Sequence, residues 1–509
     1  MSHSPPSYGF VIDNRRCIGC HACTVACKSE HSDPIGINKT WVSYIEKGTF
    51  PDVSREFHVM RCNHCADAPC VEICPTACLV TRSDGIVDFD PGRCIGCKAC
   101  MQACPYDAIA IHPDTGTATK CNYCSHRVDG GREPACVVVC PAEAIIAGDL
   151  NDPGSRIARL VTNEDVTVRK PEKGTRPKLY YVDGDASALN PSGAALRSET
   201  LWGSKAPDLA TASQAAVAPD ATERGRPRRA YDIAQRHAGS WGWKVSAYLF
   251  TKSIAAGVFV VPALAFLASP APSAWVFDAF RVSVPIALLA LAITGALLVA
   301  DLKRPERFLW VLLRPQWRSW LVRGAYIITA YGLFLPLWWW LGPTRASGAA
   351  SFFAGLGLLL AGGTAAYTGW LFGQAKGRDL WQSPLVPAHL LVQAGAAGAA
   401  TLLIASGGSV GSLAKTLQVL LLLNLGLIAQ DVWGKHATAD ASRAARLLRT
   451  GDRGVWFYAG VIAAGHVLPM VALLVGTGVG GVLAALLALV GLAVYEHLWV
   501  EAPQRLPLA

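Results

Sequence analysis

Two stretches of equal length decide the fold of the first part of this chain: CIGCHACTVAC at residues 17–27 and CIGCKACMQAC at residues 94–104. Both have the spacing C-x2-C-x2-C-x3-C. All 17 cysteines lie between Cys17 and Cys140, and they form four runs of four, with Cys78 left over. The runs are Cys17, Cys20, Cys23 and Cys27; Cys62, Cys65, Cys70 and Cys74; Cys94, Cys97, Cys100 and Cys104; and Cys121, Cys124, Cys136 and Cys140.

This spacing is typical of bacterial iron–sulfur proteins. Three thiolates two residues apart can bind three corners of a cubane, and the fourth cysteine then ligates the other cluster of a pair. The sequence therefore predicts four [4Fe–4S] clusters. Two other interpretations fit less well, because disulfide frameworks are typical of short secreted chains and zinc ribbons use cysteine pairs rather than triplets. We expect Cys78 to be a buried thiol that binds no metal.

The composition changes sharply along the chain. Residues 1–185 are polar and rich in cysteine, residues 186–242 are rich in Ala, Ser, Pro and Thr, and residues 243–509 consist mostly of Leu, Ala, Gly and Val. We predict an α+β ferredoxin-like domain of two tandem two-cluster units, a flexible linker anchored by Trp202, and an all-α transmembrane bundle. The net charge of +9 is modest, and without a continuous basic stripe we expect no nucleic-acid partner.

Eight segments of the last part are long enough to cross a bilayer, which requires about 20 apolar residues for each helix. Stretches of small residues such as AGAAGAA at 394–400 predict close contacts between these helices. The predicted spans are 245–268, 282–300, 323–341, 350–372, 385–406, 415–433, 455–475 and 479–498.

An even number of helices places both ends of the bundle on the side of the cysteine-rich domain. The opposite side has three basic residues in its predicted loops, Arg281, Arg345 and Lys415. The side of the domain has 13: Lys303, Arg304, Arg307, Arg314, Arg318, Arg323, Lys376, Arg378, Lys435, Arg443, Arg446, Arg449 and Arg453. This bias predicts that the domain lies on the cytoplasmic face of a bacterial inner membrane. The competing interpretation is that these side chains dock the domain.

The first residues, MSHSPPSYGFVIDNRRC, contain no apolar h-region, so we expect no signal peptide. Ionisable residues in membrane helices are costly and usually functional. Quinone chemistry requires hydrogen-bond partners and a proton source, which these residues could supply. We predict a quinone-binding region formed by Lys252, Asp301, Arg304, Arg307 and His389. For Arg304 and Arg307 we first expect docking of the cysteine-rich domain or a contact with Glu306, and a quinone contact second. A b-type haem requires two histidines at matched depth on facing helices. His436 lies in a loop and His466 is alone at its depth, which leaves the single pair His389 and His497, and we expect no haem.

Spacing alone leaves two pairings of the cysteine runs open, adjacent or nested. Residues 8–185 resemble the electron-transfer subunits of the molybdopterin oxidoreductase superfamily, of the DMSO reductase and polysulfide reductase type. That resemblance rests on the four ordered cysteine runs, and it implies nested pairing. The implied ligand sets are Cys17, Cys20, Cys23 and Cys140; Cys27, Cys121, Cys124 and Cys136; Cys62, Cys65, Cys70 and Cys104; and Cys74, Cys94, Cys97 and Cys100.

A second resemblance covers residues 243–505. The stretch ADLKRPERFLWVLLRPQWRSWLVRGAY at 300–326 has a D-L-x-R-P-E-R loop ahead of a helix that begins near S-W-x-x-R-G. It is similar to the NrfD-like membrane anchors, which include the polysulfide reductase anchor. The resemblance implies an eight-helix anchor that reacts with quinone and contains no haem.

Together these features predict an electron-transfer and membrane-anchor subunit. It would pass electrons between a separate molybdenum or tungsten catalytic subunit and the membrane quinone pool, which is menaquinone or ubiquinone. The chain has no Gly-rich nucleotide motif and no molybdenum ligand set, so the substrate site is expected in the partner. One alternative is a redox-driven proton-translocating module, with Asn424 and His466 as mid-depth polar groups. Another is a membrane-tethered ferredoxin scaffold without a quinone site.

Overall fold

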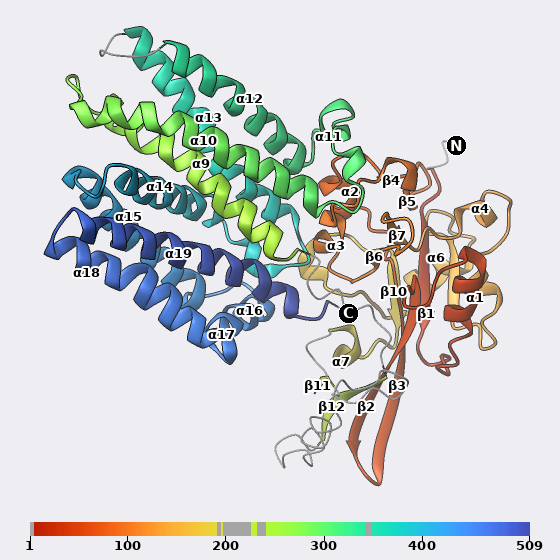
Figure 1. The fold of residues 1–509 in the computed structure, drawn as a ribbon. Helices are drawn as coiled ribbons and strands as arrows, with labels where there is room; N and C mark the ends of the chain where they lie inside the picture. The colour runs from red at the N-terminus through yellow and green to blue at the C-terminus, as the bar shows by residue number, and fades with distance from the viewer. Residues whose placement is uncertain (1–4, 191–194, 197–224, 232–240, 342–347, 509) are drawn as a thin grey trace.

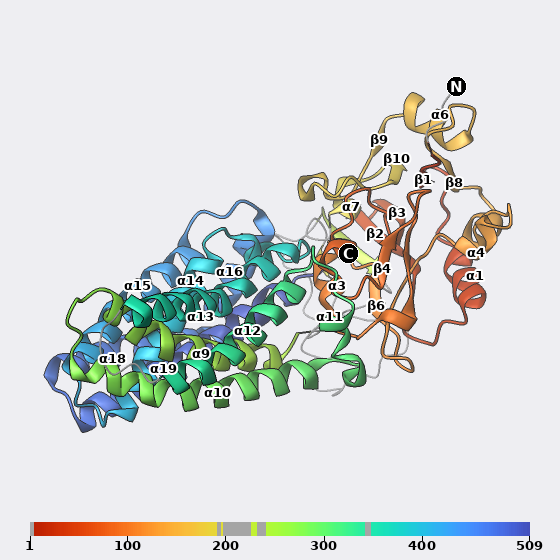
Figure 2. The same ribbon diagram turned by 90° about the horizontal axis from the view of Figure 1, so that it is seen from above.

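The computed structural model describes residues 5–190, 195–196, 225–231, 241–341 and 348–508. It consists of an iron–sulfur domain, built on residues 5–190, that lies against one end of an elongated helical bundle (Figures 1 and 2). The predicted fold class, a ferredoxin-type domain followed by a bundle of eight apolar helices, is confirmed.

Two four-stranded sheets support the iron–sulfur domain. In the first, β1 pairs in parallel with β10 and antiparallel with β8. In the second, β2 and β3 form a long antiparallel hairpin. The first sheet consists of β1 (Tyr8–Asp13), β8 (Ile145–Asp149), β9 (Val166–Thr167) and β10 (Leu179–Val182), and the second of β2 (Thr40–Thr49), β3 (Asp52–Arg61), β11 (Ala195–Leu196) and β12 (Gly225–Tyr231). Two small hairpins are β4 (Leu79–Thr81) with β5 (Val87–Phe89), and β6 (Ile109–Ile111) with β7 (Ala118–Lys120).

The two CIGC loops have the same backbone shape. Gly19 and Gly96 have φ of 70° and 67°, and His21 and Lys98 have φ of 60° and 62°. These left-handed positions turn the chain around the thiols, and glycine adopts them without steric cost. A helix begins within each cysteine run. The helices of the domain are α1 (Ala22–His31), α2 (Pro69–Ile73), α3 (Ala99–Ala103), α4 (Ser125–Val128), α5 (Ala135–Val138), α6 (Arg156–Asn163) and α7 (Ala186–Leu189).

All eight predicted spans are helical. The second span was predicted to begin at residue 282, and its helix begins eight residues earlier, at Ala274. The helix continues through Asp278 and Arg281, where the apolar pattern of the sequence ended. The spans are α9 (Trp243–Leu267), α10 (Ala274–Asp301), α12 (Trp320–Leu341), α13 (Gly348–Gln374), α14 (Val386–Ala405), α15 (Gly411–Trp433), the segment Asp452–Val475, and α19 (Val479–Glu501) with its extension to Arg505. The segment Asp452–Val475 contains α17 (Asp452–Val455), a π-helical stretch (Trp456–Val467) and α18 (Leu468–Val475). Two short helices, α11 (Trp310–Leu313) and α16 (Ala439–Arg449), lie in loops on the side of the iron–sulfur domain (Figure 1).

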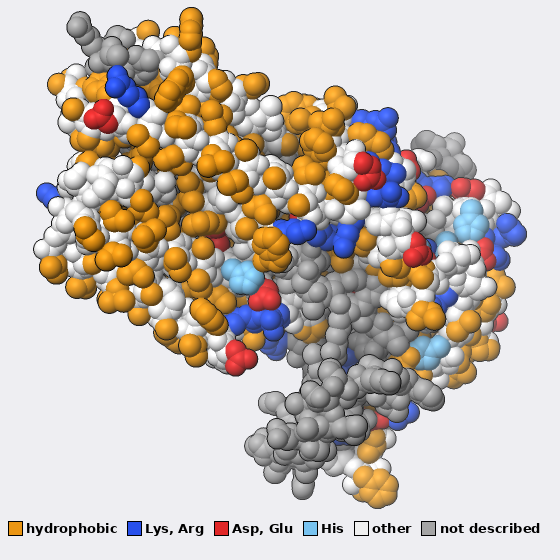
Figure 3. Space-filling view, viewed as in Figure 1, with side chains coloured by type: hydrophobic (Ala, Val, Ile, Leu, Met, Phe, Trp, Pro, Cys, Tyr) orange, Lys and Arg blue, Asp and Glu red, His pale blue; other side chains and the backbone are white. Residues whose placement is uncertain are grey.

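Small residues let these helices approach closely, as the sequence predicted. A Cβ atom on Gly257 of α9 would lie 1.7 Å from the carbonyl oxygen of Ala394 in α14. The outer surface of the bundle is covered with apolar side chains (Figure 3). Close internal packing and an apolar exterior together describe a multi-pass membrane protein.

Part of the predicted linker 186–242 is folded. Residues 186–189 form α7, and β12 adds to the free edge of β2 in the iron–sulfur domain. A strand that adds to the edge of an existing sheet is stabilised by its neighbour in that sheet. Its own sequence therefore need not alternate between apolar and polar residues. Trp241 is buried at the junction with the membrane bundle. Trp202 lies outside the described residues.

Polar contacts fasten the iron–sulfur domain to the bundle. Lys98 forms an ion pair with Asp301 at 2.8 Å. Gln102 donates to Gln504 at 2.9 Å and accepts from the guanidinium of Arg378 at 2.8 Å. One continuous hydrophobic core joins the two parts, so they form a single docked unit.

Candidate metal centres and membrane cavity

The structure gathers 16 cysteine thiols into four groups. Each group combines three thiols of one run with one thiol of another, close enough for their charges to interact. We name them the outer group (Cys17, Cys20, Cys23 and Cys140), the second group (Cys27, Cys121, Cys124 and Cys136), the third group (Cys62, Cys65, Cys70 and Cys104) and the inner group (Cys74, Cys94, Cys97 and Cys100). The nested ligand sets that the resemblance implied have the same members, and which cysteines bind each cluster stays a prediction.

The four groups form a line. Cys23 of the outer group lies beside Cys136 of the second group. Cys121 lies beside Cys62, which links the second group to the third. In the same way Cys100 of the inner group lies beside Cys70 of the third. The outer end of the line reaches the surface at Cys20, which is exposed, and the inner end lies against the membrane bundle.

The thiols surround spaces that suit a cluster better than a single ion. The thiols of the inner group and those of the third group each line a small cavity. Among the described residues, no three His, Cys, Asp or Glu side chains converge tightly enough to bind one metal ion. A tetrahedral zinc site needs four ligand atoms at about 2.3 Å from one centre, whereas a cubane spreads its thiolates over four irons. Each group supplies the four thiolates that a cubane takes, one for each iron.

Burial favours the protonated form of these thiols. It raises the pKa of Cys23, Cys97 and Cys121 to about 12, so the free thiols would be neutral at physiological pH. A coordinating metal removes the proton from a thiol and supplies the missing positive charge.

The guanidinium of Arg61 gives an independent test of this fit. Arg61 is fully buried and donates to Cys136 Sγ at 3.1 Å. Its Nε and its other terminal nitrogen have no hydrogen-bond partner among the described residues. An unpaired buried charge costs several kcal/mol, and the negative charge of an iron–sulfur cluster at this place would balance it.

Backbone amides support the sulfurs of the inner group. The N–H groups of Gly96 and Ala118 donate to Cys94 Sγ at 3.4 and 3.3 Å. The N–H of Cys78 donates to Cys74 Sγ at 3.3 Å. Such bonds hold ligating sulfurs in place and raise cluster reduction potentials. The thiol of Cys78 itself is buried, as expected, and lies against this same cavity.

A second, small cavity lies inside the membrane bundle next to the iron–sulfur domain. Helices α9, α14 and α19 form its walls. Its apolar lining comes from Leu249, Val386, Leu390 and Trp499, and its polar lining from His389, Gln393, Tyr495 and Glu496. This mixture of an apolar wall and a few convergent polar groups is typical of a site for a small organic ligand.

Aromatic rings connect the inner group to this cavity. The indole N–H of Trp241 donates to the carbonyl oxygen of Cys97 at 3.1 Å. The Trp241 ring stacks on Trp381 with centroids 5.7 Å apart, and Trp381 lies 6.1 Å from Trp499. Trp499 lines the cavity. The inner group and the cavity are therefore joined by direct contacts.

A chain of hydrogen bonds leads from the cavity into the membrane. His389 Nδ1 lies 3.0 Å from Asp431 Oδ2, and Tyr495 donates to the same oxygen at 3.1 Å. His389 Nε2 lies 3.0 Å from Asn424 Oδ1, and the amide nitrogen of Asn424 lies 2.9 Å from His466 Nε2. His466 lies in the π-helical stretch, and such irregular turns are frequent at functional sites.

Of the five residues predicted to form a quinone-binding region, His389 lines the cavity. Lys252 is fully buried nearby, where it donates to Ala365 O at 2.8 Å and to the hydroxyl of Thr368. The other three contact the iron–sulfur domain instead of the cavity. Asp301 pairs with Lys98, Arg304 donates to Thr115 O at 2.6 Å, and Arg307 donates to Cys94 O at 2.8 Å.

The sequence analysis did not single out Gln393 or Tyr495. It also did not predict that Trp241, Trp381 and Trp499 connect the inner group to the cavity. Gln393 lies four residues after His389, so the two share one face of α14, and this spacing was a usable signal. Tyr495 and the tryptophans carried no such signal. Their partners lie on other helices or in the predicted linker.

Known protein families match both parts of this chain. A family model described as polysulphide reductase, NrfD, matches residues 232–505, which is more than half of the chain. The protein belongs to this family. A second model, described as a 4Fe-4S dicluster domain, matches residues 53–150. The chain therefore joins an iron–sulfur domain that binds 4Fe-4S clusters to an NrfD membrane domain.

Similar proteins match the iron–sulfur part. Protein NrfC of Escherichia coli is 43% identical over 178 residues, which cover 34% of this chain and 80% of its own length. The NrfC homolog of Haemophilus influenzae is 41% identical over 35% of this chain and 80% of its own length. The arsenate respiratory reductase iron–sulfur subunit ArrB of a Shewanella species is 35% identical over 34% of this chain and 95% of its own length.

Proposed function

We propose that this chain is the electron-transfer and membrane-anchor subunit of a molybdopterin oxidoreductase complex. It connects a separate molybdenum or tungsten catalytic subunit to the quinone pool of the membrane. The name of the similar arsenate reductase subunit supports a reductase complex, and the NrfD domain supports the anchor. The observation that carries the proposal is the unbroken line from exposed Cys20, through the four thiol groups, to the membrane cavity.

Each thiol group is assigned one [4Fe–4S] cluster, which gives four. When bound, the clusters accept and release single electrons along the line. The outer group, near the surface, faces the catalytic partner, and the inner group exchanges electrons with the cavity. The residues of this chain hold the clusters in sequence, exclude water from most of the thiols and donate N–H bonds to the sulfurs.

The cavity beside Trp499 is assigned to the head group of menaquinone or ubiquinone. His389 and Tyr495 line this cavity, and to bind a quinone carbonyl each would exchange its present hydrogen bond to Asn424 or Asp431 for one to the quinone. Glu496 is a proton-exchanging group on the same wall. The hydrogen bond of His389 to Asp431 orients its ring. The buried Lys252 side chain lies close enough to Glu496 for their charges to interact.

A second candidate function, proton movement coupled to quinone chemistry, is favoured by the chain Asp431, His389, Asn424 and His466. Both histidines can accept a proton on one ring nitrogen and release it from the other. Asn424 links them at hydrogen-bond distance on both sides. Such a chain would carry protons between the cavity and the middle of the membrane.

The iron–sulfur domain is proposed to lie on the cytoplasmic face of a bacterial inner membrane. Arg304, Arg307 and Arg378 contact the iron–sulfur domain, so their positions can be explained by docking as well as by membrane orientation. The other ten basic residues on that side still outnumber the three on the opposite side. Protease added outside intact cells should leave the domain uncut, and cleavage there would contradict this orientation.

Iron content tests the cluster assignment. Purified protein should bind about 16 irons, and Cys94→Ser should remove about four of them. Zinc in place of iron would overturn the assignment.

Quinol oxidation tests the cavity. His389→Ala should slow electron transfer from a quinol analogue to the clusters at least about tenfold, because it removes a hydrogen bond to the quinone and the partner of Asp431. His497→Ala is the matched control, since His497 bonds Ser246 outside the cavity lining. Equal rates in the two variants would place the quinone elsewhere. Proton movement is tested separately in proteoliposomes: Asn424→Leu should abolish an electrogenic signal while clusters are still reduced.

A further inference from the structure

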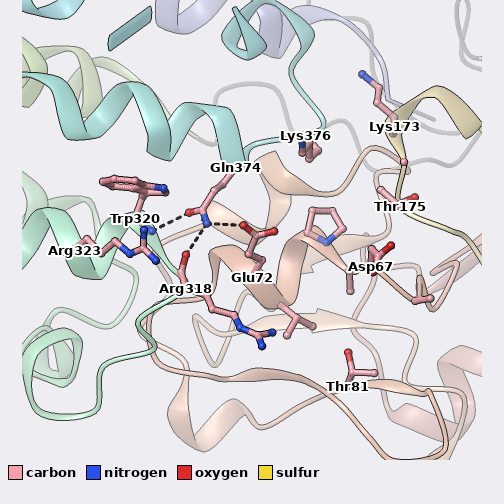
Figure 4. A pocket seen from close by; sticks show the side chains of 15 residues that line it. Asp67, Glu72, Thr81, Lys173, Thr175, Arg318, Trp320, Arg323, Gln374 and Lys376 are labelled. Atoms are coloured by element: carbon pink, nitrogen blue, oxygen red, sulfur yellow. Dashed lines mark hydrogen bonds between the residues drawn. The ribbon is translucent and has the colours of Figure 1, made fainter. Parts of the chain in front are cut away.

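A large groove lies where the iron–sulfur domain meets the ends of α12 and α13 (Figure 4). Its volume is about 1370 Å³ when the solvent-filled space at its open side is included. One wall is formed by α2, the loop before it and the end of β4, and the other by the start of α12 and the residues after α13. The groove is separate from the thiol groups and from the quinone cavity, and neither proposed function uses it.

Positive charge dominates this groove. The side chains of Arg318 and Lys376 line it, are exposed, and have no ion pair or hydrogen bond with any described residue. Arg323 adds a third positive charge, which lies over the Trp320 ring at 4.8 Å. Glu72 is the acidic residue opposite them, and it accepts a hydrogen bond from Gln374 at 3.0 Å.

The other charges of the groove are already balanced. Lys173 pairs with Asp379, and Asp67 pairs with Arg176. Three cations therefore face one carboxylate, which leaves an excess of two positive charges in a hollow that water and ions can enter. Such an excess attracts an anion, and guanidinium and ammonium groups together are well suited to phosphate.

The position of the groove indicates which phosphate compound it meets. Trp320 stacks on Trp370 at 4.8 Å, and both lie at the ends of membrane helices on the side of the iron–sulfur domain. Tryptophan at this level is typical of the membrane–water interface. Beyond it, α12 and α13 expose large apolar side chains such as Leu333 and Leu359 to the lipid. The groove therefore lies at the end of helices whose more distant turns expose an apolar surface.

We propose that this groove binds the phosphate head group of an anionic membrane lipid, with the acyl chains lying along α12 and α13. The cations come from the membrane domain, and the facing wall comes from the iron–sulfur domain. A lipid held there contacts both, so its binding stabilises the docked arrangement. Basic pockets at the ends of membrane helices bind phospholipid head groups in this way.

The test uses the full-length protein with its clusters, stripped of lipid in detergent. Phosphatidylglycerol, phosphatidylcholine and inorganic phosphate are added separately, and the retained lipid is counted by native mass spectrometry alongside the thermal midpoint. The groove variant is Arg318→Gln with Lys376→Gln. The control, Arg314→Gln with Lys435→Gln, removes the same charge from the same side of the membrane but outside the groove.

Phosphatidylglycerol should raise the thermal midpoint of the wild type, and phosphatidylcholine should not. The groove variant should bind phosphatidylglycerol roughly 30-fold more weakly, and the control should bind it normally. Equal weakening in the two variants would overturn the site, and equal protection by inorganic phosphate would overturn the lipid assignment. A photoactivatable phosphatidylglycerol should crosslink to the wild-type protein within residues 318–323. This measurement locates the lipid without depending on whether the variants fold. Crosslinks elsewhere would refute it.

Discussion

Replacing Arg61 by glutamine removes a positive charge from the interior of the electron path. Arg61 is fully buried, lies over the Phe10 ring at 4.5 Å and bonds Cys136 at 3.1 Å. Its positive charge stabilises the reduced state of the nearest cluster, which is the more negative state. The substitution should therefore lower the reduction potential of the cluster held by the second group.

The size of this shift follows from the geometry. With the charge of the cluster centred about 6 Å from the guanidinium and an effective dielectric constant of about 20, the interaction is about 3 kcal/mol. At about 2.3 kcal/mol for each 100 mV, this corresponds to a decrease of about 120 mV. The more distant inner group should shift far less, because the interaction falls with distance.

The assay is a potentiometric titration of the full-length protein, monitored by electron paramagnetic resonance. Arg61→Lys is the matched control, since it keeps the charge and should keep most of the potential. Iron content shows whether each variant retains its clusters. A change of less than about 20 mV in Arg61→Gln, or an equal change in all four clusters, would refute the assignment of Arg61 as their counter-charge.

Three further substitutions probe packing, charge and docking. Gly257→Leu should destabilise the membrane domain by more than about 3 kcal/mol, because its side chain would collide with the backbone of Ala394, and thermal melting in detergent measures this. Burial lowers the pKa of Lys170 from 10.5 to about 7, so the unfolded protein binds more protons between these values and stability should rise with pH from 7 to 10. Lys170→Met should flatten that rise in a series of thermal melts, and an unchanged slope would contradict it. Arg378→Ala should cost about 3 kcal/mol and speed hydrogen exchange at the domain boundary, because Gln102 and two backbone carbonyls lose their donor.

Several features of this protein could be read from local sequence. The CIGC loops repeat one backbone shape because glycine and the residue that follows the second cysteine occupy left-handed positions. The lengths of the apolar segments predicted the eight membrane helices of the described residues. Inside a bilayer, a helix is one of the few structures in which every backbone N–H and C=O group is hydrogen-bonded. Gly398 in AGAAGAA likewise marked a close contact between helices.

Other expectations depended on how distant segments meet. Asp301 was predicted near quinone because it lies at the end of a helix on the side of the iron–sulfur domain, whereas Arg304 and Arg307 were expected first to dock that domain. That end also faces the docked domain, and the contacts with Lys98, Thr115 and Cys94 fix them there. Trp241 fell in a predicted linker, yet it bridges the inner group to the cavity, and its burial depends on both domains.

By itself the sequence determined the kind of each part: four cysteine runs spaced for cubane clusters and eight apolar helices long enough for a bilayer. Both are local properties, decided by residues a few positions apart. The tertiary structure decided which cysteine completes which group, the order of the groups and the chain from His389 to His466. These depend on contacts between residues tens to hundreds of positions apart, which spacing along the chain does not record.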